Sequence, residues 1–321
     1  MKREAPFIDW LRFTLPYTDD SFVWIDSRFG GRIPLNKGLL SYSVAELLVN
    51  GGMCAYSPDR KQNKVMVELS ARALRSLSLH QDPQNFILDA FGRGATFTRI
   101  DVALDDYRGT MNLSRVWRSV KRDEVKTRFR KFSRIVGHDR LDPSAAGDTI
   151  YGGDRSSESF LRIYDKEAES GTDGHWVRME FEFKKNRANE LAGRIARGTI
   201  DLRNLIYYYI DFQRRTPGAR RGWPTAEWWE EFLQPTSRER LYFPQYEIGL
   251  EEVQQWLKTQ VSSALVLVAR TDGEALTKIF DEGEIKIEQN RRYKQIEAQY
   301  NAQQERKLKT ERYLQKRKAR K

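Results

Sequence analysis

The stretch at residues 149–169, TIYGGDRSSESFLRIYDKEAE, combines a turn-forming loop with a strand pattern in which apolar and charged residues alternate. The loop GGDRSSE separates two short runs rich in aromatic and branched residues, as expected for the two arms of a hairpin. On the second arm, one side carries Leu161 and Ile163, and the other carries Phe160, Arg162, Tyr164 and Lys166. The stretch therefore predicts a hairpin that holds Tyr164 on a charged face.

Two more segments repeat this alternation. They are residues 96–105, TFTRIDVALD, and residues 176–184, WVRMEFEFK. Their polar sides carry the carboxylates Asp101, Asp105, Glu180 and Glu182. Strands with one apolar and one polar face, interrupted by amphipathic helical patterns, are typical of α+β domains. We therefore expect an antiparallel sheet with helices on one face and an open, RRM-like catalytic face on the other.

Three other segments complete the expected layout of this part of the chain. Residues 7–15 predict a first strand that stops at Pro16. The glycines and the proline within residues 30–34 predict a loop. Residues 126–137 predict a single strand.

Composition divides the chain into four parts. Residues 1–212 hold the predicted strands and therefore the expected catalytic domain. Residues 213–222, QRRTPGARRG, predict a linker. Residues 223–283 predict a small helical subdomain. Residues 284–321 predict a basic, helix-prone tail with too few apolar residues for a core of its own.

The positive charge is concentrated in that tail. The chain has a net charge of +11 and a pI near 9.6. Residues 285–321 carry 13 Lys and Arg against 4 Glu, whereas the remaining residues carry 43 basic against 41 acidic side chains. This excess favours a polyanionic partner. We expect the tail to hold DNA without sequence preference or to contact a partner, and we expect DNA phosphates to be bound by Arg214, Arg215, Arg220 and Arg221.

Cysteine content and hydropathy indicate a cytoplasmic protein. Cys54 is the single cysteine, so the chain forms no internal disulfide. The start MKREAPFIDW lacks the apolar stretch of a secretory signal, and no run approaches the length of a membrane span. We therefore expect no membrane partner.

The polar side chains of the three strands suggest a reaction at a phosphate. Carboxylates from two strands suit Mg²⁺ or Mn²⁺, which can polarise a phosphoryl oxygen. A tyrosine titrates near about 10 and needs a nearby cation to act as a nucleophile. Lys166 and Arg162 could stabilise its phenolate. We therefore expect Tyr164 to attack a DNA phosphodiester, leaving a 5′-phosphotyrosyl link and a free 3′-hydroxyl.

The blocks FTRIDVALDD, TIYGGDRSSESFLRIYDKEAE and WVRMEFEFK, in this order, resemble the replication initiation factor family over roughly residues 7–212. That family comprises rolling-circle plasmid initiators of the Rep_trans type and related relaxases of conjugative elements and phages. The resemblance implies an origin-specific nicking and closing enzyme that acts on double-stranded origin DNA and single-stranded DNA. It also implies a divalent metal, frequent dimerisation and recruitment of a host helicase.

Carried over by residue, the resemblance makes Tyr164 the nucleophile and makes Asp101 and Glu180 metal-binding carboxylates, with Asp105 and Glu182 as further candidates. The three histidines, His80, His138 and His175, are never paired as His-hydrophobic-His. A carboxylate site would therefore take the place of the histidine metal site of other rolling-circle initiators.

Other interpretations of the same residues stay open. Tyr151 is a second candidate nucleophile. Alternating carboxylates also form cross-strand salt bridges, here with Arg99 or Arg162. The GGDRSSE loop fits a hairpin turn better than a phosphate cradle. The chain could be a non-catalytic nucleic-acid-binding protein with an RRM-like sheet, or a metal-dependent nuclease that activates water.

Overall fold

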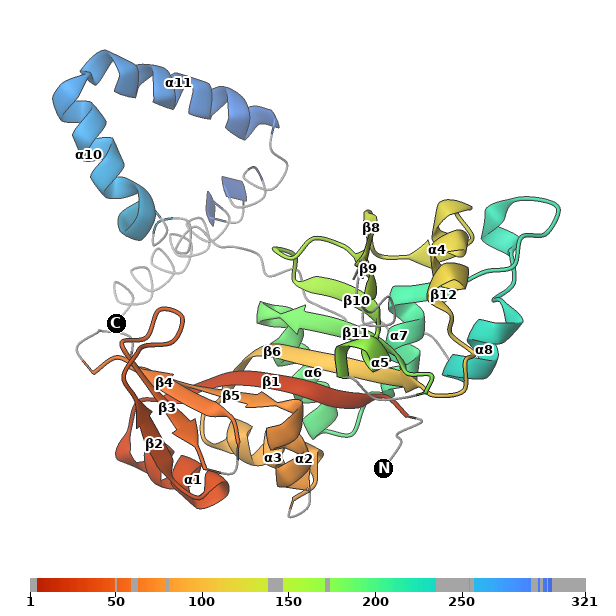
Figure 1. The fold of residues 1–321 in the computed structure, drawn as a ribbon. Helices are drawn as coiled ribbons and strands as arrows, with labels where there is room; N and C mark the ends of the chain where they lie inside the picture. The colour runs from red at the N-terminus through yellow and green to blue at the C-terminus, as the bar shows by residue number, and fades with distance from the viewer. Residues whose placement is uncertain are drawn as a thin grey trace, which may run out of the picture. The chain divides into compact units, whose positions relative to one another are not determined.

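The computed structural model describes residues 5–49, 51–58, 63–78, 81–137, 147–170, 174–234 and 257–289, together with residues 254, 294, 297–298 and 300–301. The chain divides into two compact units, Met1–Phe243 and Pro244–Lys321. All strands formed by the described residues belong to the first unit (Figure 1). The strands that form the candidate site therefore all lie in the first unit.

A ten-stranded antiparallel sheet forms the centre of the first unit. In spatial order its strands are β2 (Arg32–Leu35), β3 (Val44–Leu48), β4 (Met53–Tyr56), β5 (Lys64–Ser70), β1 (Phe7–Pro16), β6 (Thr96–Asp106), β11 (Val177–Lys184), β10 (Ser159–Asp165), β9 (Asp148–Gly152) and β8 (Phe132–Val136). The predicted α+β class and antiparallel sheet are confirmed. The first strand of the chain lies inside the sheet, between β5 and β6.

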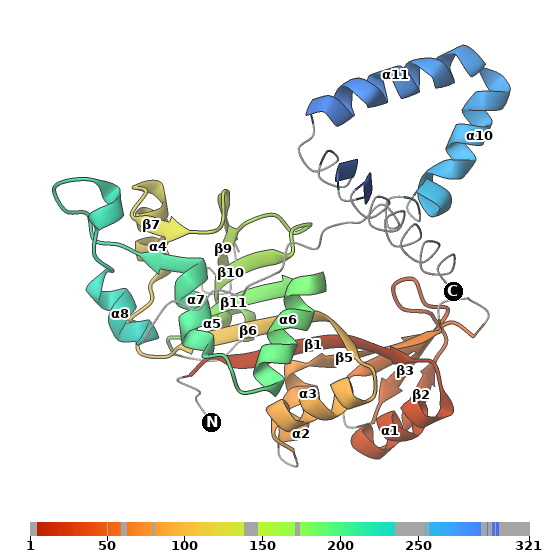
Figure 2. The same cartoon turned by 180° about the vertical axis from the view of Figure 1, so that it is seen from behind.

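Helices bury the apolar face of this sheet. They are α1 (Asp19–Phe29), α2 (Ala71–Ser78), α3 (Pro83–Gly92), α4 (Leu113–Lys121), α6 (Lys185–Ala196) and α7 (Leu202–Tyr209). Figure 2 shows α2, α3 and α6 in front of the sheet, and their buried side chains join those of the strands in one hydrophobic core. None of the helices described is long and apolar enough to cross a membrane.

The period-two pattern assigns each side chain of the three polar strands to a face. The core contains Leu161, Ile163, Met179, Phe181 and Phe183, each at most 1% exposed. The residues between them lie on the opposite face, as predicted. That face is polar but not open along β6 and β11, because Asp101, Asp105 and Glu180 are only 1%, 5% and 4% exposed. Arginines on the same and neighbouring strands lie against these carboxylates.

Two local expectations were wrong. The segment before residues 30–34 forms α1, which begins after the N-cap Thr18 and ends at Gly30 in the left-handed conformation, and β2 follows directly. The single strand expected at 126–137 is two strands, β7 (Val125–Thr127) and β8. Between them Phe129 turns into the core, while β7 pairs with β12 (Ile210–Phe212) in a separate small sheet.

The helical patterns after residue 222 fall into both units. In the first unit, α8 (Glu227–Leu233) buries Trp229 completely, with its ring 5.1 Å from that of Phe212. In the second unit the described residues form a π-helical turn (Leu257–Val261), α10 (Ser262–Thr271) and α11 (Gly273–Gln289). Most of the predicted tail lies outside the described residues, and the domain limits expected from composition stay predictions.

Candidate active site

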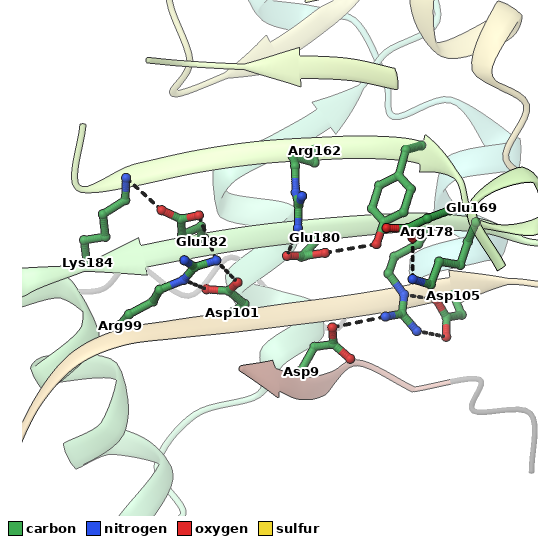
Figure 3. A network of polar contacts seen from close by, with 12 residues as sticks. Asp9, Arg99, Asp101, Asp105, Arg162, Glu169, Arg178, Glu180, Glu182 and Lys184 are labelled. Atoms are coloured by element: carbon green, nitrogen blue, oxygen red, sulfur yellow. Dashed lines mark hydrogen bonds and ion pairs between the residues drawn. The ribbon is translucent and has the colours of Figure 1, made fainter. Parts of the chain in front are cut away.

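Tyr164 on β10 contacts Glu180 on β11. The strand register pairs Arg162 with Glu180 and Tyr164 with Arg178, so these side chains share the polar face. The Tyr164 hydroxyl donates a hydrogen bond to Oε2 of Glu180 at 3.2 Å. Arg162 donates to Oε1 of the same carboxylate (Figure 3). Glu180 therefore links the tyrosine hydroxyl to a guanidinium.

Arg178 is held by carboxylates from two other strands. It donates to Asp105 on β6 through Nε at 2.7 Å and through Nη2 at 2.9 Å. Its Nη1 lies 3.1 Å from Oδ2 of Asp9 on β1. Figure 3 shows this arginine between the two acids. A buried cation is thereby fixed in the register position opposite Tyr164.

Sequence reasoning missed both Arg178 and Asp9. The alternation in residues 176–184 carries a signal for Arg178, because it stands two positions before Glu180 and shares its face. Asp9 has no such signal. The register of β1 against β6 is irregular between Ile8 and Trp10, and Asp9 lies in that irregularity.

Asp9 has spare hydrogen-bonding capacity beside this site. Its Oδ2 faces Arg178, but its Oδ1 is buried and has no hydrogen-bond partner among the residues that the structure describes. Burial raises the pKa of Asp9 above the usual range, Arg178 opposes this shift, and the charge of Glu180 adds to it. The N-terminal strand thus contributes a carboxylate, Asp9, whose charge is only partly balanced by Arg178.

A second cluster lies further along the same face. Arg99 donates to both oxygens of Asp101, at 2.8 and 2.6 Å, and lies 3.0 Å from Glu182. Lys184 approaches the other oxygen of Glu182 at 2.7 Å. Burial raises the pKa of Asp101 to about 7, against the opposing effect of Arg99. Arg99–Glu182 joins β6 to β11 and is one of the cross-strand ion pairs that were an alternative interpretation of the alternating carboxylates, whereas Arg99–Asp101 and Lys184–Glu182 each lie within one strand.

The surroundings of Tyr164 favour its protonated form. Burial raises its pKa above the ordinary value, and the charge of Glu180 raises it further. Arg178 and Arg162 act in the opposite direction. The tyrosine therefore needs a base at its hydroxyl, and Glu180 is the group in hydrogen-bond contact.

Lys166 is close to the tyrosine ring but is engaged elsewhere. It is the first residue of α5 (Lys166–Ser170), and its Nζ lies 5.6 Å from the centroid of the Tyr164 ring. The same ammonium forms an ion pair with Glu169. Arg162 approaches the ring at 5.4 Å and faces Glu180. Of the two predicted cations, Arg162 is the one in direct contact with the Tyr164–Glu180 pair.

A hollow of about 300 Å³ opens at Tyr164. It is lined by Gly147, Thr149, Tyr151, Arg162, Tyr164, Asp165, Ala168 and Glu169. Larger hollows exist, but they are lined by residues around β7 and the hairpin turn. We assign the site to the smaller hollow because it contains the tyrosine and its arginine.

The four predicted metal ligands reach one face, but each is paired with a cation. Asp101 and Glu182 share Arg99, Asp105 binds Arg178, and Glu180 binds Arg162. Among the residues that the structure describes, no group of three His, Cys, Asp or Glu side chains is placed to hold a metal ion. The donors have the hard oxygen chemistry that Mg²⁺ or Mn²⁺ prefers, but in this arrangement an ion would have to displace the arginines that are paired with them.

The arginines expected to bind DNA are exposed. Arg220 and Arg221 line a hollow of about 700 Å³ together with Lys126 and Arg130. Arg220 forms an ion pair with Asp123 in the same hollow. Arg214 lies 3.9 Å from Glu227, and Arg215 lies over the Trp223 ring. Arg220 and Arg221 therefore belong to a basic surface at this hollow, whereas Arg214 and Arg215 do not line the hollow.

The GGDRSSE loop is a turn, as its composition indicated. Asp154 accepts hydrogen bonds from the backbone N–H and the hydroxyl of Ser156, at 2.9 and 2.7 Å. The N–H of Ser157 is donated to the carbonyl of Asp154 at 3.0 Å. The loop thus closes on its own aspartate.

A family model described as "Replication initiation factor" (Rep_trans) matches residues 95–283. The matched span contains Asp101, Tyr164, Arg178 and Glu180. It covers more than half of the chain and includes every strand of the site except β1.

Two relatives agree with this match. The "Putative DNA relaxase NicK" of Bacillus subtilis (strain 168) is 24% identical over 234 residues, which cover 68% of this chain and 66% of that protein. A solved structure of a rolling circle replication initiator protein from Geobacillus stearothermophilus has a TM-score of 0.63 at 24% identity, covering 74% of this chain and 99% of that one. The chain spans just under two thirds of the relaxase, and the structural likeness shows a shared fold.

Proposed function

Because the chain belongs to the replication initiation factor family, we propose that it cuts and rejoins one strand of DNA at an origin, with Tyr164 as the nucleophile. The observation that carries this proposal is the hydrogen bond from the Tyr164 hydroxyl to Glu180, in a hollow that also exposes Arg162. The expected roles are initiation of rolling-circle replication or of conjugative transfer.

Glu180 acts as the base in this reaction. It takes the hydroxyl proton as the tyrosine oxygen attacks the phosphorus. A bond forms between that oxygen and phosphorus, the bond from phosphorus to the 3′ oxygen breaks, and the released 3′ oxygen takes a proton from water. The phosphate stays on Tyr164 through its 5′ side. Attack by a 3′-hydroxyl reverses these steps and reseals the strand.

Two arginines supply positive charge. Arg162 lines the hollow, so its guanidinium can bind the phosphate that enters. Arg178 is buried and lowers the pKa of the tyrosine, so it stabilises the phenolate oxygen as charge develops. Asp105 and Asp9 hold Arg178 in place, which makes them positioning residues.

A covalent trap tests the proposal against the alternatives. A suicide oligonucleotide, whose cut releases a short fragment, leaves the protein joined to the DNA when tyrosine is the nucleophile. Cleavage without an adduct would instead support a nuclease that activates water. Binding without cleavage would support a non-catalytic nucleic-acid-binding protein.

Metal dependence is a separate proposal. Binding of Mg²⁺ or Mn²⁺ at these carboxylates requires the ion to compete with Arg99 or Arg162. We expect titration with Mn²⁺, followed by electron paramagnetic resonance, to show binding that is lost in Asp101→Asn and in Glu180→Gln. Equal binding by these variants and the parent chain would exclude the carboxylates as the metal site. The reaction steps above use only groups of this chain.

The basic surface around β7 is proposed to hold DNA phosphates. It comprises Lys126, Arg130, Arg220 and Arg221, against a single carboxylate, Asp123. Each phosphate neutralised by a cation releases counterions, so binding by this surface depends steeply on salt. Contacts with a host helicase and with a second copy of the chain stay expectations of family membership.

Replacing Arg130 and Arg221 together by alanine is expected to weaken binding of DNA of any sequence. The slope of log K against log salt concentration should fall by about 1 for each lost phosphate contact. Fluorescence anisotropy at several salt concentrations measures this slope. Arg75→Ala, which removes an exposed arginine of α2, is the matched control. A slope as steep as that of the parent chain would place the phosphate contacts elsewhere.

A further inference from the structure

Tyr151 lies next to Tyr164 on the polar face. The register of β9 against β10 pairs Thr149 with Tyr164 and Tyr151 with Arg162. Tyr151 is therefore a diagonal neighbour of Tyr164, at a backbone separation of about 7–8 Å. Both tyrosines line the same hollow.

The Tyr151 ring is part of a stacked group. It stacks on Phe160 with ring centroids 5.7 Å apart and an interplanar angle of 23°. The Arg155 guanidinium, from the hairpin turn, lies 5.6 Å from the centroid of each ring. An aromatic pair with an arginine over it is the kind of surface on which proteins stack the bases of single-stranded nucleic acids.

This group lies outside the main hydrophobic cluster on the other face of the sheet, although Phe160 is buried. On β9 the core side chain is Ile150, which points to the opposite face. Neither Tyr151 nor Phe160 belongs to the hydrophobic clusters of the described residues. Tyr151 is half-buried and lines the hollow. The ring is available to a ligand that enters beside Tyr164.

We propose that Tyr151, supported by Phe160 and Arg155, stacks the base next to the scissile phosphate of single-stranded DNA. The inference rests on the proposed function, because it takes the Tyr164 hydroxyl as the point where the phosphate binds. The diagonal separation of the two tyrosines is comparable to the span from a backbone phosphate to a neighbouring base. Tyr151 is thus a positioning residue, which needs its ring and not its hydroxyl.

Binding can be measured without cleavage. In a Tyr164→Phe background, a short oligothymidine with one central 2-aminopurine serves as the probe, because stacking quenches the fluorescence of this base. We expect quenching to persist with Tyr151→Phe and to be lost with Tyr151→Leu, which keeps an apolar side chain without an aromatic face. The dissociation constant should rise by about 5- to 150-fold, the equivalent of about 1–3 kcal/mol for one stacked base.

Cleavage assays on variants that retain Tyr164 distinguish a role of Tyr151 in positioning the DNA from a role in the chemical step. Tyr151→Leu should raise KM with little change in kcat, and Tyr151→Phe, which restores the aromatic ring, should bring KM back toward the parent value. Equal quenching by the leucine and tyrosine forms would overturn the proposal. So would loss of the adduct in Tyr151→Phe, which would make Tyr151 the nucleophile. The proposal that Tyr164 is the nucleophile fails by a different result. A covalent adduct would then still form in Tyr164→Phe, in which Tyr151 is unchanged.

Discussion

Replacing Tyr164 by phenylalanine is expected to abolish the covalent protein–DNA adduct and to lower nicking of supercoiled origin DNA on the order of 10³-fold or more, because Tyr164 is the proposed nucleophile. The ring and its burial are retained. Within the described part of the chain the hydroxyl makes one hydrogen bond, to Glu180, which keeps its ion pair with Arg162. The folded state should therefore lose only about 0.5–1.5 kcal/mol. Denaturing gel electrophoresis after reaction with a suicide oligonucleotide measures the adduct.

The control for this variant is Tyr56→Phe. Tyr56 is a half-buried tyrosine on β4 whose ring packs against Phe22, on a strand that is not part of the site. This change should leave both nicking and adduct formation as in the parent chain. An adduct that persists in Tyr164→Phe at an undiminished rate would remove Tyr164 from the reaction.

Replacing Glu180 by glutamine is expected to lower the rate of adduct formation by about 10²- to 10⁴-fold, the usual contribution of a general base, which is its proposed role. The loss should shrink as the pH rises. The Glu180 charge raises the pKa of Tyr164, so its removal lowers that pKa and allows the phenolate to form at a lower pH. Single-turnover rates across the alkaline range should thus climb more steeply in the variant than in the parent chain.

The pH profile separates this role from that of a metal ligand, because alkaline pH does not restore a lost ligand. Glu68→Gln is the matched control. Glu68 is 6% exposed, against 4% for Glu180, and it is hydrogen-bonded to Arg12 on β1. A parent-like rate in Glu180→Gln at neutral pH would contradict the assignment of Glu180 as the base.

Most of the site could be predicted from the alternation of apolar and polar residues. The period of two in residues 159–164 and 176–184 was enough to place Tyr164, Arg162 and Glu180 on one face, and antiparallel pairing of β10 with β11 then made them neighbours. The partners of the carboxylates could not be predicted in the same way. Which guanidinium binds which acid depends on register and side-chain reach across three strands, and neither is fixed by spacing along one strand.

Irregular backbone explains what the sequence did not reveal. Asp9 reaches the site because β1 loses regular register with β6 between Ile8 and Trp10, and no residue pattern marks that point. In contrast, α1 was missed although its end signals were present, Thr18 before it and Gly30 after it. Gly30 and Gly31 were interpreted as part of a loop, but Gly30 ends α1.

The ion pairs of Arg178 with Asp9 and Asp105 also join segments of the chain that are synthesised at different times. Asp9 belongs to the first strand, Asp105 to the sixth and Arg178 to the eleventh. While the chain emerges from the ribosome, β1 is made early but does not gain its β6 partner until residue 106 has been added, and the β6–β11 pairing waits for residue 184. A site assembled from such distant segments forms late in folding. An incomplete chain therefore lacks the ion pairs that fix Arg178 opposite Tyr164, and under the proposed function it could not yet cut DNA.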